Sequence, residues 1–139
     1  GLGHKNYTVS TFNRSDEPVE LIGREYYVHP WHFQYTLDGS KTRYLSKNNL
    51  FVSDSPYEYL TLYANADKVY TDMVHATIPS LVYGTPVKYY KIDDRRNAFE
   101  SINYIHKDDK GFLTIDKNLL AIEKNQIENY VLNKIQQIL

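Results

Sequence analysis

The chain has 139 residues, with 16 Lys and Arg against 17 Asp and Glu, and it contains no cysteine. The net charge of −1 argues against binding nucleic acid by bulk attraction to phosphate, because that mode needs a basic face. The absence of cysteine excludes a disulfide scaffold, a thiolate zinc site, an iron–sulfur cluster and a cysteine nucleophile. No apolar run approaches the roughly 20 residues that span a bilayer, so we expect a cytoplasmic protein without a membrane span.

The length predicts a single domain over residues 1–139. The only methionine is Met73, so we expect the chain to be an excised piece of a longer protein. Tyrosine is unusually common, with 14 copies. Because tyrosine packs its ring and keeps its hydroxyl wet, this count favours a strand-rich fold with a wet edge over a sugar-contacting cleft.

The first third of the chain predicts short strands separated by turns. Their β-branched and aromatic residues are typical of strands, and Pro30 ends the second one. The expected elements are a strand over 6–12, a turn over 13–18, a strand over 25–29, a polar loop or short helix over 41–49 and a strand over 50–52.

From Leu50 onward, strands alternate with helices. Ser55 can cap a helix that begins at Pro56, and Pro79 falls within the first turn or so of the next helix, where its missing N–H costs little. The pattern predicts a helix over 56–65, a strand over 68–71, a helix over 75–83, a strand over 86–90, a polar helix from Asp93, and a long amphipathic helix from about Lys117 to Leu139 that covers a sheet. Such alternation implies crossover connections, and therefore an α/β fold with a mainly parallel sheet.

The turn after the strand 68–71 is a candidate site. In an open parallel sheet, ligands bind beyond the carboxyl ends of the strands, and a helix N-terminus there offers free N–H groups to an anion. His75, in the first turn of the next helix, can donate to an anion or shuttle a proton, while the small Ala76 and Thr77 let a ligand approach the backbone. A histidine bonded to backbone, and an Asp72 that merely caps the helix, are the plain structural alternatives.

Residues 55–90 carry four short motifs: Pro56-x-Glu58-Tyr59-Leu60, Asn65-Ala66-Asp67, Thr71-Asp72-x-x-His75 and Gly84-Thr85-Pro86-Val87. In this order and spacing they resemble the C-terminal domain of the polysaccharide pyruvyl transferase family. The resemblance implies a Rossmann-like three-layer domain, one half of a two-domain transferase arranged like the GT-B glycosyltransferases. It also implies a bacterial enzyme of exopolysaccharide biosynthesis that moves a pyruvyl group from phosphoenolpyruvate to a sugar hydroxyl, without a cofactor or a metal.

The resemblance assigns the catalytic, donor-binding role to His75, supported by the turn residues Thr71 and Asp72. Many members carry Arg-Leu or Ser-Phe before this histidine, where this chain has Met73-Val74, so a natural clamp for a phosphate or carboxylate is missing. The other candidate substrate-binding residues are Ala76, Thr77, Gly84, Thr85, Arg95 and Arg96. The expected partners are a sugar or polysaccharide acceptor and a missing N-terminal domain, without which we expect the isolated domain to be inactive.

Two other clusters have plain structural interpretations. The segment His29-Pro30-Trp31-His32 could bind a metal or stack a sugar, but a strand-end loop with a packed tryptophan explains it more simply. The segment Asp93-Asp94-Arg95-Arg96 fits a charged helix start, although its arginines could reach the same crevice. Two further functions stay open: a GT-B glycosyltransferase that uses a nucleotide sugar, and a non-catalytic domain that binds a glycan or a partner domain.

Overall fold

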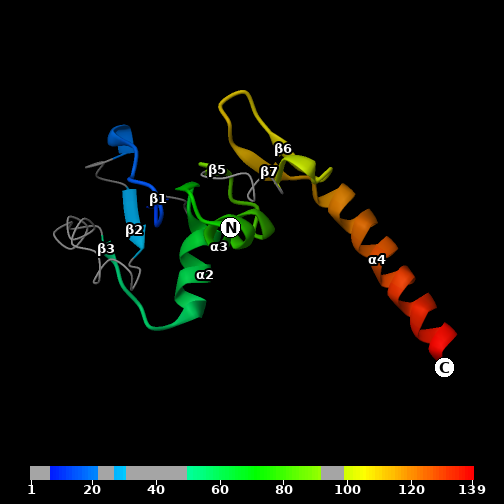
Figure 1. The fold of residues 1–139 in the computed structure, drawn as a ribbon. Helices are drawn as coiled ribbons and strands as arrows, with labels where there is room; N and C mark the ends of the chain where they lie inside the picture. The colour runs from blue at the N-terminus through cyan, green and yellow to red at the C-terminus, as the bar shows by residue number, and fades with distance from the viewer. Residues whose placement is uncertain (1–6, 22–26, 31–49, 92–98) are drawn as a thin grey trace.

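The structure is a computed structural model that describes residues 7–21, 27–30, 50–91 and 99–139 (Figure 1). Seven strands form one sheet in the order β3-β2-β1-β4-β5-β7-β6. The strands are β1 (Thr8–Thr11), β2 (Tyr27–Pro30), β3 (Leu50–Phe51), β4 (Lys68–Thr71), β5 (Val87–Tyr89), β6 (Ile105–Lys107) and β7 (Leu113–Ile115). The helices are the short η1 (Val19–Leu21), α2 (Pro56–Asn65), α3 (Val74–Val82) and α4 (Lys117–Ile138).

The strands β1 to β5 are parallel to one another, and β7 runs antiparallel to both of its neighbours, β5 and β6. The order 3-2-1-4-5 is that of a doubly wound sheet, in which the chain builds outward from β1 in both directions. The predicted Rossmann-like α/β fold with a mainly parallel sheet and a long C-terminal helix is therefore confirmed.

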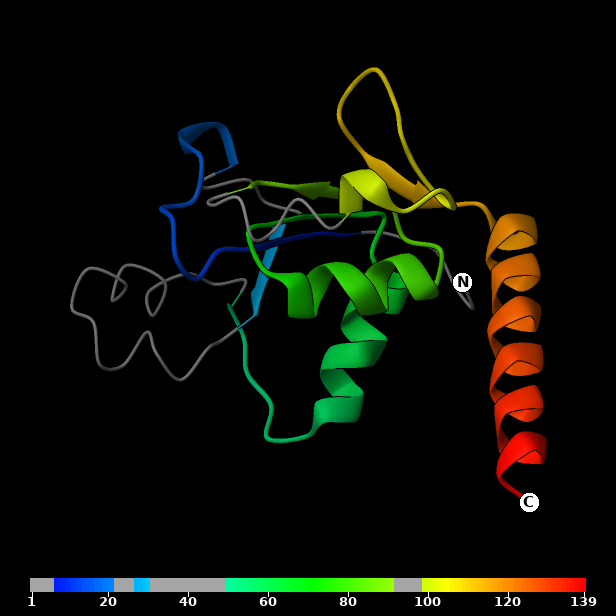
Figure 2. The same ribbon diagram turned by 45° about the vertical axis from the view of Figure 1, so that its right-hand side comes forward.

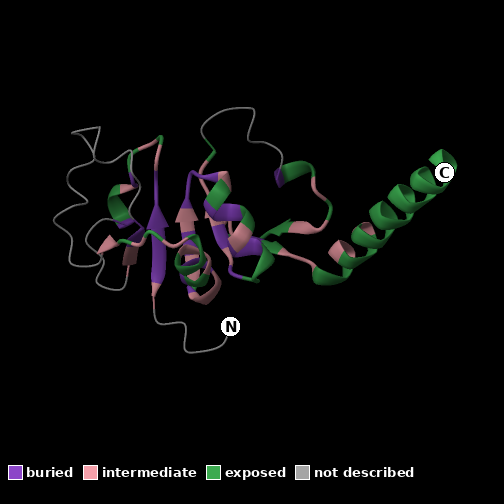
Figure 3. Cartoon of the chain, turned by 90° about the horizontal axis from the view of Figure 1, so that it is seen from below, coloured by how far each residue is buried: buried purple, intermediate pink, exposed green. Residues whose placement is uncertain are grey.

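The core lies on the face of the sheet that α2 and α3 cover (Figure 2). Val9, Val69 and Val87 stand side by side in register on β1, β4 and β5, and all three are fully buried. Leu62 of α2 and Leu81 of α3 belong to the same cluster. This buried layer holds the central strands together (Figure 3), and so fixes the loops at their ends.

The helices around the central strands begin and end close to the predicted positions. α2 starts at Pro56 as expected, but the Ser55 side chain makes no capping hydrogen bond, contrary to the prediction. Pro79 is the sixth residue of α3, beyond the predicted first turn, so it cannot donate to the carbonyl of His75. Gly84, with φ of +83°, ends the α3 segment as predicted.

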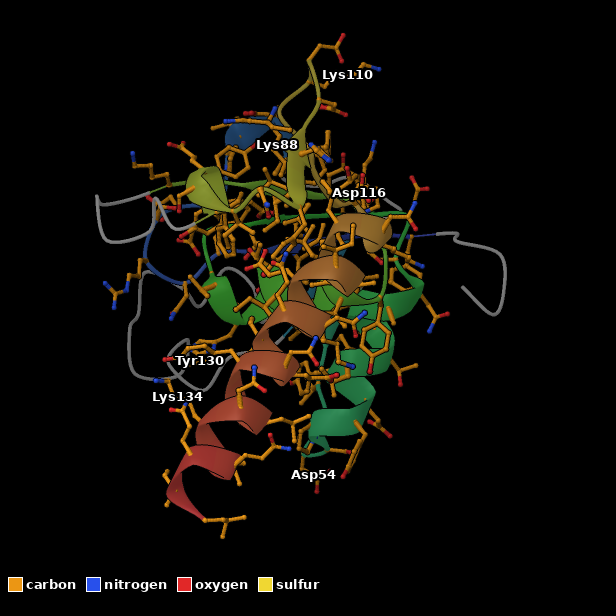
Figure 4. The ribbon with its side chains drawn as sticks, turned by 90° about the vertical axis from the view of Figure 1, so that its right-hand side faces the viewer. Asp54, Lys88, Lys110, Asp116, Tyr130 and Lys134 are labelled. Carbon is orange, nitrogen blue, oxygen red and sulfur yellow. The ribbon has the colours of Figure 1, made fainter. Side chains whose placement is uncertain are left out.

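The C-terminal third differs from the prediction in two ways. β6 and β7 form a hairpin that the sequence analysis missed, joined by a turn at 108–111. The long helix α4 exists, but it does not cover the sheet: none of its residues is buried, and it projects away from the strands (Figures 1 and 3). Most of its apolar side chains beyond the first turn are exposed to solvent, with Ile138 84% exposed. On its surface Lys134 lies over the ring of Tyr130, with Nζ 5.6 Å from the ring centroid (Figure 4).

Two predicted segments, the loop over 41–49 and the polar helix from Asp93, lie outside the described residues, apart from a short 3₁₀ turn over 99–101. In the part of the chain that is described, none of the helices has the length and apolar content that a bilayer span requires.

Candidate functional site

The topology places the loops after β1 and β4 next to each other. These two strands are parallel neighbours. From β1 the chain continues to β2, toward one edge of the sheet, and from β4 it continues to β5, toward the other edge. This is the switch point at which open α/β sheets bind ligands, beyond the carboxyl ends of the strands. The loop after β1 spans residues 12–18, and the turn after β4 spans residues 72–73.

Asp72 joins the two loops. Its side chain is fully buried, and Oδ1 accepts a hydrogen bond from the backbone N–H of Asn13 at 2.9 Å. Its Oδ2 accepts three more: from the N–H of Arg14 at 3.0 Å, from the N–H of Ser15 at 2.7 Å and from the Ser15 hydroxyl at 2.9 Å. The alternative that Asp72 caps the following helix is therefore wrong, because both of its oxygens face the loop after β1.

The N-terminus of α3 lies directly after this turn. Thr71 Oγ1 accepts from the N–H of Met73 at 2.9 Å, and no side chain caps the helix. The N–H groups of Ala76 and Thr77 both donate to the Met73 carbonyl, at 3.3 and 3.1 Å. These two amides are thus already bonded within the helix, so the predicted contact of Ala76 and Thr77 with a ligand stays a prediction and would not use free N–H groups.

Val74 and His75 are the first two residues of α3, and the N–H groups at these positions of an α-helix have no acceptor within the helix. His75 is exposed and is the second residue of α3, so its imidazole stands in the first turn, as predicted. The partial positive charge of the helix N-terminus and a titratable side chain therefore occur at one place.

Arg14 is a candidate residue that the sequence analysis missed. Its backbone is fixed through Asp72, three positions before His75 in the chain, and its side chain is exposed. A guanidinium at this switch point suits a phosphate or a carboxylate. The signal that could have revealed it is a cation in the loop that directly follows a strand, since such loops carry function in parallel sheets.

Gly84 and Thr85 lie at the other end of α3 from His75, and a nine-residue helix is about 13 Å long. Thr85 is 1% exposed, and its hydroxyl donates to the carbonyls of Tyr63 at 2.9 Å and Ala64 at 3.3 Å. The structure therefore does not bring these two predicted residues to His75, and Thr85 instead ties the end of α2 to the start of β5.

The remaining candidates divide between structural residues and undescribed ones. His29 is 1% exposed, and its Nδ1 lies 3.1 Å from the Ser10 carbonyl and 3.2 Å from Glu17 Oε1, which favours the structural interpretation over a surface metal or sugar site. Within the described ranges, no group of three or more His, Asp or Glu side chains could hold a metal ion. Trp31, His32, Arg95 and Arg96 lie outside the described residues.

Comparison with known proteins bears directly on this site. The family model described as polysaccharide pyruvyl transferase matches residues 10–94. No curated protein and no solved structure matches the sequence. The matched range includes the loop after β1, the Asp72 turn and His75, and it leaves out the β6–β7 hairpin and α4. Because it covers more than half of the 139 residues, the chain belongs to the polysaccharide pyruvyl transferase family.

Proposed function

We propose that the carboxyl ends of β1 and β4 form the donor site of a transferase that moves a pyruvyl group from phosphoenolpyruvate to a sugar hydroxyl of a polysaccharide. One observation carries the proposal: Asp72 holds the loop with Arg14 beside the uncapped helix N-terminus that bears His75. The family match to residues 10–94 supports the reaction class.

Phosphoenolpyruvate has a phosphate and a carboxylate on a three-carbon unit, so its site needs closely spaced donors for two anionic groups. The N–H groups of Val74 and His75 supply a fixed partial positive charge. Arg14 supplies a full charge from the adjacent loop, which would take the part of the arginine that some members carry where this chain has Met73.

Ketal formation requires that C3 of the enol gains a proton, that sugar hydroxyls add to C2 and that the bond from C2 to the phosphate oxygen breaks. In this mechanism His75 hydrogen-bonds the phosphate and donates a proton to it as it leaves. Thr71 and Asp72 hold the turn in place and do not touch the donor. The acceptor sugar approaches from a second, N-terminal domain in the GT-B-like arrangement, and the gene's full open reading frame tests that expectation.

Calorimetric titration of the 139-residue chain with phosphoenolpyruvate tests the site. His75→Ala and Arg14→Ala should each weaken binding at least tenfold. His106→Ala is the matched control, because His106 is an exposed histidine on the β6–β7 hairpin, remote from the switch point, and it should leave binding unchanged. Binding of a uridine nucleotide in place of phosphoenolpyruvate would identify a nucleotide-sugar donor, and equal binding by wild type and His75→Ala would overturn the proposal.

A further inference from the structure

A buried polar cluster lies beneath the loop after β1. Glu17, His29 and Ser10 are 3%, 1% and 1% exposed. Ser10 Oγ donates to Glu17 Oε1, and His29 Nδ1 lies 3.2 Å from the same oxygen. Because Nδ1 faces two acceptors, this carboxylate oxygen and the Ser10 carbonyl, we assign a proton to Nδ1 of the imidazole. A carboxyl group in the core costs free energy unless such donors satisfy it, so its presence calls for a role.

The cluster contains the residue types of a hydrolase triad, but its connections exclude that chemistry. In a triad the serine hydroxyl donates to the imidazole, and the imidazole donates to the carboxylate. Here Ser10 donates to Glu17, and its hydroxyl lies within the protein. A nucleophile placed in this way reaches no substrate, so the three side chains act on the protein itself.

Glu17 fixes the C-terminal end of the loop after β1, and Asp72 fixes the N-terminal end of the same loop. The N–H groups of residues 13–15 donate to Asp72, which belongs to the turn after β4. Two residues later, the carboxylate of Glu17 is bonded to β1 through Ser10 and faces β2 through His29. Two buried carboxyl groups therefore fix one short loop at both ends, and Arg14 lies between them.

From this geometry we infer that Glu17 is a positioning residue for the anion site: it fixes the loop that presents Arg14 beside the N-terminus of α3. The identity of the anion rests on the function proposed above, whereas the fixing of the loop does not. Glu17→Gln keeps an oxygen that accepts from Ser10 and His29, and should keep the loop in place. Glu17→Ala removes the acceptor and should release the loop.

Amide hydrogen exchange, followed by NMR on the 139-residue chain, tests the positioning without any ligand. Glu17→Ala should raise the exchange rates of the Arg14 and Ser15 amides at least tenfold. The Val69 amide, which donates to the Pro86 carbonyl at 2.9 Å in the core sheet, should change less than twofold. Glu128→Ala, which removes an exposed carboxylate on α4, is the matched control and should change neither rate.

Titration with phosphoenolpyruvate then separates the two proposals. Glu17→Ala should weaken binding at least tenfold, and Glu17→Gln should restore it to within threefold of wild type. Equal acceleration at Val69, Arg14 and Ser15 would reduce Glu17 to a general stabiliser and overturn the inference, as would unchanged exchange in the loop. If Glu17→Ala does not fold, Ser10→Ala, which removes one donor to Glu17, should still speed loop exchange selectively. Absence of binding by wild type would overturn only the proposed function.

Discussion

Asp72→Asn should destabilise the domain far more than its small change in volume suggests. The carboxylate accepts four hydrogen bonds while fully buried. An asparagine has one acceptor oxygen, which can serve the three donors on the Oδ2 side, and its NH₂ group then faces the N–H of Asn13. One buried donor loses its partner, which costs about 1–3 kcal/mol, and three charge-assisted bonds become neutral ones at about 1 kcal/mol each.

We therefore expect a loss of about 3–5 kcal/mol in the free energy of unfolding, since these contributions overlap and do not add fully. For a domain of this size that loss lowers Tm by about 10 °C or more. Urea denaturation followed by far-UV circular dichroism measures it. The loop 12–18 should also become more mobile, so phosphoenolpyruvate binding should weaken in parallel.

Asp116→Asn is the matched control for this prediction. Asp116 Oδ1 also accepts two backbone N–H groups, from Asn118 and Leu119, but it does so at the exposed start of α4. Asparagine caps helices about as well as aspartate, so this variant should unfold at nearly the same urea concentration as wild type. If the free energy of unfolding of Asp72→Asn differs from that of wild type by less than about 1 kcal/mol, Asp72 is not the residue that joins the two loops.

The hydrogen bond from the Leu119 N–H lowers the pKa of Asp116 from its ordinary 3.8. The stabilisation of α4 by the charged cap is therefore fully present above pH 3.8, and it is lost as the pH falls through the lower pKa of the folded state. Circular dichroism should show this loss as a step in helicity, and Asp116→Ala should show no such step. Burial raises the pKa of Tyr70 from 10 to about 12. The stability that the neutral Tyr70 hydroxyl contributes should therefore be fully present below pH 10 and should decline as the pH rises toward 12. Urea denaturation at each pH measures this decline, which Tyr70→Phe should lack. Gly84→Ala should cost about 1–2 kcal/mol in thermal unfolding, because φ is +83° and the added Cβ meets no atom within 4 Å, so only backbone strain opposes it.

The elements around the site could be predicted because their signals are local. Pro56 marks the start of α2 and Gly84 marks the end of the α3 segment, and each of these residues lies within a few positions of the apolar helical pattern that it delimits. β4 matched its predicted range for the same reason, since β-branched and aromatic residues favour a strand irrespective of what pairs with it. The mainly parallel sheet followed from the alternation of strands and helices, because parallel neighbours need crossover connections, whereas the order of the strands did not follow from it.

The chemistry of the turn was predictable only in part. His75 is where the motif placed it, because its position depends on the local start of α3. The partners of Asp72 lie 57 to 59 residues earlier in the chain and are mostly backbone N–H groups, which every residue except proline carries. No sequence pattern marks such donors, so the sequence could name Asp72 without revealing that it joins two loops.

The direction of α4 depends on a connection that periodicity does not report. The spacing of Ile127, Val131 and Ile138 predicts a helix with an apolar side, and the helix is present. Only Asp116 separates the last residue of β7 from the first of α4, so the chain has no connector with which to turn back over the sheet. Because β7 and β6 extend the sheet beyond β5, the helix starts near its outer edge and runs on from there. Predicting the true direction of α4 would have required knowledge of the β6–β7 hairpin. The two strands of that hairpin have three residues each, which is too few to show an alternating pattern in the sequence.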